Sequence, residues 1–164
     1  MLRNHIYHFN NLSLYKNLFE KIANDSITRN EISKHRILVL NANEYSKDIQ
    51  SQFLEDIGFI DIDFADQDKQ LIKLLNKHTY QIIIYEVLSF NSKTLSTCKL
   101  IRSTQKNKNT IILSATYMYE DTLNKCNEYD MNGIIIKPFI FSMYKKSLCF
   151  HLTELKNNRI KSIC

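Results

Sequence analysis

Short apolar runs alternate with amphipathic segments along the chain from residue 36 onward. Four of the runs are continuous, which is the pattern of strands buried on both faces: 37–40, 82–87, 110–115 and 134–136. The run at 60–64 instead alternates apolar residues with aspartates, as an edge strand with one wet face does. The pattern therefore predicts five strands, with 82–87 in a central position.

Helical periodicity fills the intervals between the predicted strands. Ile49, Phe53, Leu54 and Ile57 lie on one face of a helix that Gly58 ends in the usual C-terminal position. Four more helices are expected at similar intervals: around 71–75 from a start at Asp66 or Asp68, around 95–101, around 123–126, and from about 141 to beyond 155.

This alternation predicts an α/β fold with a helical extension. Five strand–helix units of this length require parallel strands joined by right-handed crossovers, with helices on both faces of the sheet. The expected architecture is flavodoxin-like, a doubly wound parallel five-stranded sheet of order 2-1-3-4-5. Leu14, Leu18 and Ile22 form the apolar face of a separate helix, which needs a surface to pack on. The predicted division is an N-terminal helical extension over 1–35, the α/β domain over 36–158 and a tail over 159–164.

Composition narrows the class of protein without changing the fold. The 164 residues are 44% hydrophobic and 24% charged, which is ordinary for a globular protein. No apolar run approaches the roughly 18 residues that span a bilayer, and the N-terminus lacks the apolar core of a signal peptide. We therefore expect a cytoplasmic protein with no membrane span. The four cysteines, Cys98, Cys126, Cys149 and Cys164, are widely spaced. We therefore expect reduced thiols and no metal site among them. We also expect no bound cofactor.

The net charge of +5 is unevenly distributed along the chain. Residues 1–36 carry six Lys/Arg against three Asp/Glu, residues 37–137 eleven against thirteen, and residues 138–164 five against one. Two basic flanks therefore surround a mildly acidic middle. Such flanks contact nucleic acid, an anionic membrane or an acidic partner in some proteins, and are solvated helix faces in others.

The segment 133–139 carries the clearest candidate for chemistry. Lys137 emerges from the last predicted strand at its carboxyl end, which is the edge where open parallel sheets bind ligands. Pro138 follows it and fixes the backbone, because its ring locks φ and removes a donor. The sequence thus predicts an immobile positive charge at this edge.

Five landmarks in order give the chain a family resemblance: 37–43, 80–86, 111–115, 119–126 and 131–139. Over roughly residues 36–152 the sequence resembles the receiver domain of two-component response regulators, particularly those attached to hybrid histidine kinases. The resemblance implies a site in which an acidic pair holds Mg²⁺, an aspartate accepts a phosphoryl group from a histidine, and a Ser/Thr and a Lys bind the phosphoryl oxygens.

The residues at the matching positions make this site degenerate. The acidic pair maps onto Asn41 and Ala42, which together offer one neutral carbonyl where Mg²⁺ prefers carboxylates. The acceptor maps onto Glu86, whose extra methylene moves the carboxylate forward by about 1.5 Å. We therefore expect neither a metal nor aspartate-type phosphotransfer at this site.

The remaining matching positions bear on what Glu86 does. Ser114 and Lys137 fit the family pattern, whereas the aromatic switch position maps onto Ile134. Glu86 either reaches toward Lys137 and stands in for the phosphoaspartate, or is a remnant in a site under no chemical demand, and the missing aromatic favours the second account. Because both follow buried parallel strands, Glu86 and Lys137 are expected to meet in one strand-end cleft, with Ser114 lining it.

The resulting functional prediction is an atypical receiver, independent of phosphorylation and of Mg²⁺, that is not an enzyme and acts through protein–protein contact. Its partner would be a histidine kinase, another regulator or an output protein, met through the surface around 117–130, Phe139 and 141–152, and a homodimer is an open alternative. Tyr144 either joins that surface or packs in the core. The alternative function, less favoured, is a nucleic-acid-binding regulator that uses the basic flanks. A third, least favoured, is an active phosphoacceptor at Glu86 or Ser114.

Overall fold

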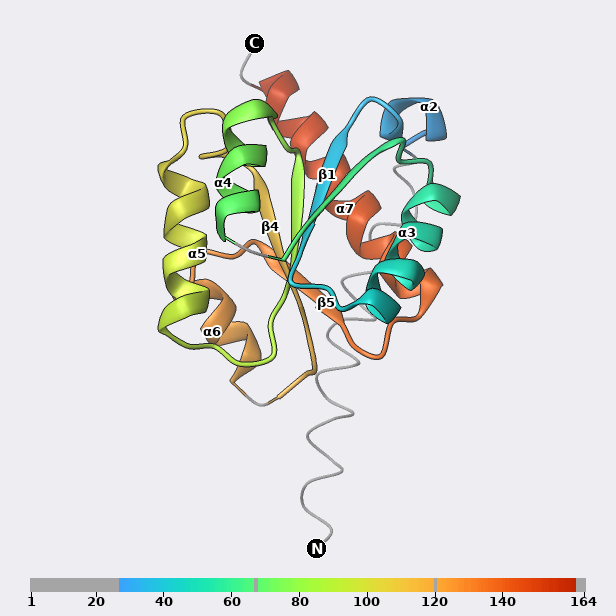
Figure 1. The fold of residues 1–164 in the computed structure, drawn as a ribbon. Coiled ribbons are helices and arrows are strands. Elements are labelled where there is room, and N and C mark those ends of the chain that lie inside the picture. The colour runs from blue at the N-terminus through green and yellow to red at the C-terminus, as the bar shows by residue number, and fades with distance from the viewer. Residues whose placement is uncertain (1–26, 67, 120, 162–164) are drawn as a thin grey trace, which may run out of the picture.

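The computed structural model describes residues 27–66, 68–119 and 121–161 (Figure 1). The helix predicted around Leu14–Ile22 and Cys164 lie outside the described residues. Within the described ranges, no helix is both long enough and apolar enough to cross a bilayer.

Five parallel strands form one sheet. They are β1 (Arg36–Leu40), β2 (Asp61–Ala65), β3 (Ile82–Glu86), β4 (Ile111–Thr116) and β5 (Gly133–Ile136). Their spatial order is β2-β1-β3-β4-β5, so β3 is central and β2 lies at an edge. The predicted flavodoxin-like topology and the central place of the third strand are confirmed.

Helices cover both faces of this sheet. They are α2 (Arg29–Ile32), α3 (Glu44–Ile57), α4 (Asp68–Lys77), α5 (Ser92–Ser103), α6 (Thr122–Glu128) and α7 (Phe141–Lys161). Figure 1 shows α3 and α7 on one face and α4, α5 and α6 on the other. Side chains alternate between the faces of each strand, and each face packs one hydrophobic cluster against its helices.

Local signals set both ends of α3. The Asn43 side chain accepts from the Ser46 amide at 2.9 Å and caps the start of the helix. Gly58 ends it with φ of 121°, and a Cβ there would meet the Arg29 side chain at 2.6 Å. Arg29 in turn donates to the carbonyls of Glu55 and Asp56, at 3.0 and 3.3 Å. The short α2, which the apolar pattern did not predict, is thereby fastened to the end of α3.

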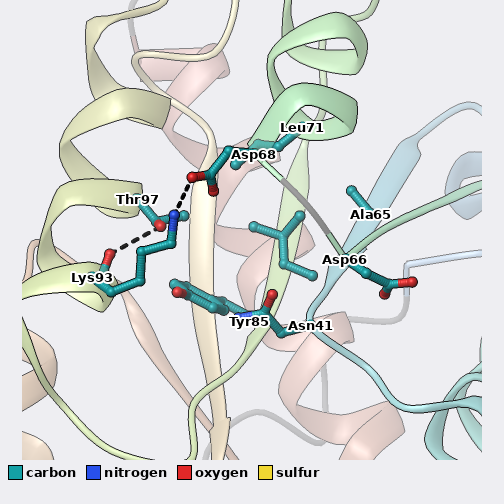
Figure 2. Close-up of a pocket in the computed structure, with 9 residues that line it drawn as sticks. Asn41, Ala65, Asp66, Asp68, Leu71, Tyr85, Lys93 and Thr97 are labelled. Atoms are coloured by element: carbon teal, nitrogen blue, oxygen red, sulfur yellow. Dashed lines mark hydrogen bonds and ion pairs between the residues drawn. The ribbon is translucent and has the colours of Figure 1, made fainter.

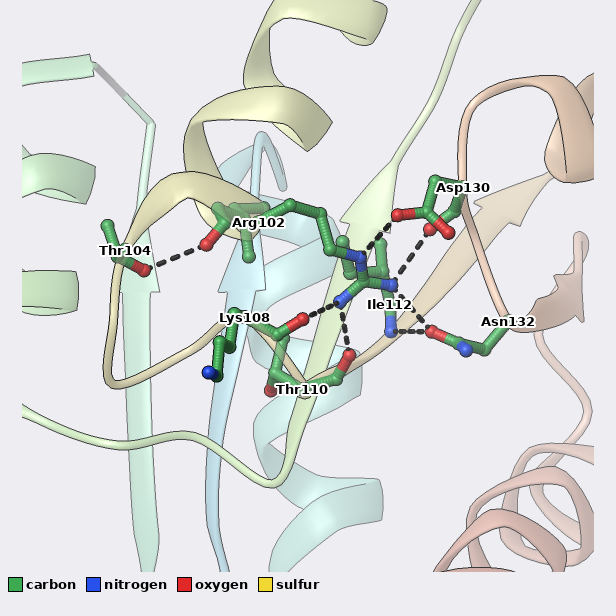
Figure 3. Close-up of polar contacts among 8 residues, drawn as sticks. Arg102, Thr104, Lys108, Thr110, Ile112, Asp130 and Asn132 are labelled. Atoms are coloured by element: carbon green, nitrogen blue, oxygen red, sulfur yellow. Dashed lines mark hydrogen bonds and ion pairs between the residues drawn. The ribbon is translucent and has the colours of Figure 1, made fainter.

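Arg102 holds together the edge of the sheet at which the strands begin, and we call its contacts the arginine clamp (Figure 3). The Arg102 guanidinium, at the end of α5, donates to the carboxylate and the carbonyl of Asp130, both at 2.8 Å. It also donates to the Thr110 carbonyl at 2.5 Å and to Asn132 Oδ1 at 2.9 Å. Asn132 Oδ1 accepts a further bond from the Ile112 amide at 2.8 Å. One side chain thus joins α5 to the segments that lead into β4 and β5.

Candidate functional site

Four of the predicted site residues lie at the carboxyl edge of the sheet: Asn41, Ala42, Glu86 and Lys137. Asn41 follows β1, Glu86 ends β3 and Lys137 follows β5. A cleft of about 430 Å³ opens there between the loops after β1 and β3, and its lining includes Asn41, Ala42 and Glu86. This is the edge at which open α/β sheets usually bind ligands.

Glu86 and Lys137 form a buried ion pair at this edge. Lys137 Nζ donates to Glu86 Oε2, and only 4% of the Glu86 side chain and 14% of the Lys137 side chain are exposed. The Lys137 ammonium also lies 5.3 Å from the centroid of the Phe139 ring, within range of a cation–π contact. The prediction that Glu86 and Lys137 meet at the strand ends is confirmed.

The other carboxylate oxygen of Glu86 is bound by helix α3. Ser46 Oγ and Gln50 Nε2 donate to Glu86 Oε1, the amide at 2.6 Å. Gln50 Oε1 accepts from the Tyr144 hydroxyl of α7 at 2.8 Å. These four residues and Lys137 form a continuous polar chain, the Glu86 network, that joins α3, β3, α7 and the end of β5.

Aromatic rings cover the Glu86 network. Phe53 packs edge-on against Phe141 and against Tyr144, with centroids 5.1 and 5.5 Å apart. Phe139 meets Tyr144 at 5.5 Å, again edge-on. Tyr144 is 1% exposed, and burial, followed by the charge of Glu86, raises the pKa of its phenol well above the ordinary value. Tyr144 is therefore a neutral core donor, which settles the alternative between core and interface in favour of the core.

The positions that match the acidic pair offer little to a cation. Asn41 is exposed and has a left-handed backbone with φ of 59°. Its backbone N–H donates to the Ala65 carbonyl at 3.0 Å. Asparagine tolerates that conformation better than most residues. Ala42 is 4% exposed and packs with the cluster between the sheet and α3 and α7. The edge thus presents one neutral amide where the family resemblance implies two carboxylates.

A second cavity, of about 210 Å³, adjoins the cleft on the side of α4 and α5 (Figure 2). Asn41, Asp66, Tyr85 and Lys93 line both hollows. Lys93 reaches across to Asp68 and pairs with its carboxylate. Asp66, the remaining acid in the lining of these hollows besides Glu86, pairs with Lys47 at 2.7 Å. The carboxylates at this edge are therefore already neutralised by lysines.

These contacts decide whether Mg²⁺ fits the site that the resemblance implies. Mg²⁺ requires near-octahedral oxygen ligands, but both oxygens of Glu86 accept bonds from protein donors. Among the residues that the structure describes, no group of three or more His, Cys, Asp or Glu side chains could hold a metal ion. The residues present do not fit Mg²⁺.

Ser114 does not line the cleft, so that expectation is wrong. Ser114 is fully buried, and its hydroxyl makes no hydrogen bond to Glu86 or Lys137. It pairs in register with Tyr85, one position before Glu86, and successive side chains of a strand point to opposite faces. Ser114 therefore faces the layer of α5 and α6, next to Ile134 on β5, which is also buried.

Ser46, Gln50 and the polar role of Tyr144 were not predicted. The periodicity placed Ile49 on the buried face of α3, whereas Ile49 is half-buried and the buried stripe runs through Ser46, Gln50, Leu54 and Ile57. The signal that could have found them is the four-residue spacing of two polar residues ahead of Leu54. A polar residue on the stripe that faces the core needs a buried partner.

Comparisons with known proteins agree with this architecture. The family model of the response regulator receiver domain matches residues 37–148. A receiver domain of a histidine kinase from Clostridium thermocellum superposes with a TM-score of 0.61 and 18% identity, over 72% of this chain and 97% of that one. The chemotaxis response regulator CheY4 of Vibrio cholerae superposes with a TM-score of 0.63 and 19% identity, over 71% of this chain and 98% of that one.

A third similar structure contains a metal ion. The receiver domain of a sensor histidine kinase from Pseudomonas aeruginosa, with a TM-score of 0.57 and 19% identity over 70% of this chain and 93% of that one, holds a magnesium ion in its active-site cleft. At these identities the likeness concerns the fold. No match is found among curated proteins.

Proposed function

This chain belongs to the family of response regulator receiver domains, the signalling modules of two-component systems, and we propose that it signals without phosphorylation and without Mg²⁺. The observation that carries the proposal is the state of Glu86. Its two carboxylate oxygens accept bonds from Lys137, Ser46 and Gln50 in a buried setting.

An engaged carboxylate is a poor phosphoryl acceptor. The attacking oxygen must present a free lone pair in line with the phosphorus, and a metal ion must neutralise the charge on the transferring group. Freeing Glu86 would leave Lys137 buried without its partner, which typically costs about 3–5 kcal/mol. Binding of Mg²⁺ should be weak as well, because Asn41 and Ala42 replace the two acids that would hold the ion.

The ion pair supports the account in which Glu86 takes the place of a phosphorylated aspartate. In the family that this chain resembles, the lysine binds phosphoryl oxygens, and here Lys137 binds the oxygen of a longer carboxylate. The hydrogen bonds through Gln50 then connect this anion to Tyr144 in α7. Ser114 and Ile134, at the positions of the usual hydroxyl–aromatic coupling, have no equivalent connection in the described structure. The domain would thus hold one signalling state permanently.

Such a module acts through a protein partner and carries out no reaction itself. The surface around α6, β5 and the start of α7 exposes four large apolar side chains that suit such a contact, namely Tyr117, Tyr119, Leu123 and Ile140, which are 51%, 62%, 39% and 53% exposed. A histidine kinase, another regulator or an output protein would meet this surface.

The test is chemical phosphorylation of two matched proteins. The full chain and the triple variant Asn41→Asp, Ala42→Asp, Glu86→Asp are incubated with acetyl phosphate and Mg²⁺, and intact mass is measured. We expect no mass gain for the wild type, and one phosphoryl group on the variant, whose acids are restored. A stable phosphoryl group on Glu86 of the wild type would refute the proposal.

A further inference from the structure

The fold gathers basic residues on the outer surface of α4 and α5. Residues 68–77 and 92–110 together hold eight Lys/Arg against one Asp/Glu. By contrast, Glu44–Ile57 in α3 holds one against four, and residues 121–130 hold one against three. The sheet topology thus separates charges that are mixed along the sequence.

Helices α4 and α5 lie side by side on one face of the sheet (Figure 1). The Lys93–Asp68 pair joins their first turns. At their other ends, Lys106 donates to the carbonyl of Asn76 at 2.8 Å and holds the loop after α5 against α4. The two helices and this loop therefore form one continuous surface, the α4–α5 face. It carries five exposed lysines whose side chains make neither an ion pair nor a hydrogen bond in the described structure: Lys69, Lys73, Lys77, Lys99 and Lys108.

The lysines are regularly placed. Lys69, Lys73 and Lys77 recur every fourth residue of α4, so their Cα atoms rise by about 6 Å per step along one side of the helix. Lys99 and Lys108 continue the positive surface on α5 and its following loop. The other cations of this face are engaged: Lys93 pairs with Asp68, Lys106 donates to the Asn76 carbonyl, and Arg102 forms the clamp at Asp130 (Figure 3).

We propose that the α4–α5 face binds the phosphodiester backbone of a nucleic acid. Its chemistry fits a polyanion better than a protein, because protein interfaces are depleted in lysine and enriched in aromatic residues. Of the described residues in α4, α5 and the loop after α5, Ile72 is the one large apolar side chain that is exposed, at 43%. A run of free ammonium groups with no aromatic anchor matches backbone contact without base readout.

This surface differs from the one through which the proposed signalling partner binds. The two lie on different parts of the molecule, since the partner surface surrounds α6, β5 and the start of α7. The nucleic-acid proposal therefore does not depend on the phosphorylation state of the receiver. It also differs from the basic flanks at residues 1–36 and 138–164.

The test compares two triple variants of the full chain that remove the same charge. Lys73→Gln, Lys77→Gln, Lys99→Gln alters the α4–α5 face, and Lys34→Gln, Lys145→Gln, Lys146→Gln alters exposed lysines elsewhere. Binding to a short labelled DNA duplex and to a single-stranded RNA is followed by fluorescence anisotropy between about 50 and 200 mM salt. Thermal unfolding of each variant verifies the fold.

We expect the first triple variant to bind at least tenfold more weakly at low salt and to lower the slope of log K against log salt by about 2–3. The control variant should change affinity less than threefold. Preference for duplex or single strand identifies the form of backbone that the face accepts. Equal weakening by both variants, or no binding of wild type to either nucleic acid at low salt, would overturn the proposal. So would a lysine-dependent affinity that appears only for phosphatidylserine vesicles or for polyglutamate.

Discussion

Glu86 shows how one methylene changes the chemistry of a strand end. The longer side chain brings its carboxylate to Lys137 and to the first turns of α3, where Ser46 and Gln50 donate to it. A carboxylate near the start of a helix is also favoured by the helix dipole. The residue at the position that matches the phosphoryl acceptor of the family is here held in a buried ion pair and by hydrogen bonds from α3.

Removing this anion should destabilise the protein strongly. Glu86→Ala leaves the Lys137 ammonium buried and unpaired, so the free energy of unfolding should fall by about 3–5 kcal/mol. The paired change Glu86→Leu with Lys137→Met removes both charges and should recover part of the loss, because no unpaired ammonium remains. The recovery is incomplete because Ser46 and Gln50 lose the carboxylate that accepts their hydrogen bonds. Urea unfolding measures all three proteins. A loss below about 1 kcal/mol in Glu86→Ala would mean that the ion pair does not form.

The sequence could predict the meeting of Glu86 and Lys137 but not the rest of the Glu86 network. Both residues end buried parallel strands, and strand topology alone brings such ends to one edge. Gln50 and Tyr144 meet through the rotation of two helices about their axes, which an apolar periodicity defines only to within a residue. Ser114 was misplaced for a related reason, since a shift of one position along a strand moves a side chain to the other face.

At the level of elements, α3 and α7 are joined by polar as well as apolar contacts. Gln50 interrupts the buried stripe of α3 and is tolerated there because Glu86 and Tyr144 satisfy its amide. Buried polar groups with partners specify one packing of two helices more narrowly than apolar contacts do.

The Tyr144 hydroxyl should therefore matter for stability. Tyr144→Phe leaves Gln50 Oε1 buried without a donor, and the free energy of unfolding should fall by about 1–3 kcal/mol. Tyr45→Phe is the matched control, because Tyr45 is 77% exposed and its change should stay within about 0.5 kcal/mol. Chemical denaturation compares the two. Equal effects in both variants would show that the bond to Gln50 contributes nothing.

The Arg102 clamp makes a separate prediction about the entry to β5. Arg102→Lys keeps the charge but loses the planar fork that reaches two carbonyls and Asn132 at once. We expect faster amide exchange at Gly133 and Ile134 and a loss of about 1–3 kcal/mol. Asp130→Asn should have a much smaller effect, because the Asp130 carboxylate is largely exposed. Unchanged amide exchange at Gly133 and Ile134 in Arg102→Lys would argue that the segment leading into β5 is held by its own backbone hydrogen bonds.

Element boundaries followed the apolar pattern closely, with one instructive difference. The edge strand was predicted from Ile60, yet β2 begins at Asp61 and Ile60 is 76% exposed. Arg36 pairs with Asp61 and Asp63, at 2.9 and 2.8 Å, and these ion pairs accompany the register of β1 and β2. The apolar pattern alone places the start of the strand at Ile60, whereas the ion pairs of Arg36 with Asp61 and Asp63 fall within the observed strand.

At the scale of the whole molecule, the net charge of long sequence segments does not show where charges gather on the folded surface. Residues 37–137 are close to neutral in sum, but the fold places the lysines of α4 and α5 together and the acids of α3 and α6 elsewhere. A strand–helix alternation sends successive helices to different surfaces, so the mean charge of a long segment says little about any one face. Residues 1–26 of the N-terminal basic flank lie outside the described residues, and the role of that flank stays a prediction.

Stability of the whole fold should decline in mild acid because of His151. This side chain of α7 packs on Gly133, where an added Cβ would meet its Nε2 at 2.6 Å, and burial lowers its pKa from 6.5 to about 4. Between those two values the unfolded chain binds a proton that the native protein does not. The free energy of unfolding should therefore fall by up to about 1.4 kcal/mol per pH unit as the pH drops from about 6.5 to about 4.

The comparison that isolates His151 is the slope with pH, because a substitution in α7 also changes the absolute stability. His151→Asn should flatten the dependence of the unfolding free energy on pH between about 6.5 and 4.5, whereas His78→Asn should leave the wild-type slope in place. Carboxylates such as Glu31, whose pKa is lowered to about 2 chiefly by the hydrogen bond from Lys156, lose their contribution only at more acidic pH. They therefore do not mask the change. A wild-type slope that persists in His151→Asn would mean that the imidazole takes up its proton in the native state at the ordinary pH, and that the packing of α7 on Gly133 tolerates the charge.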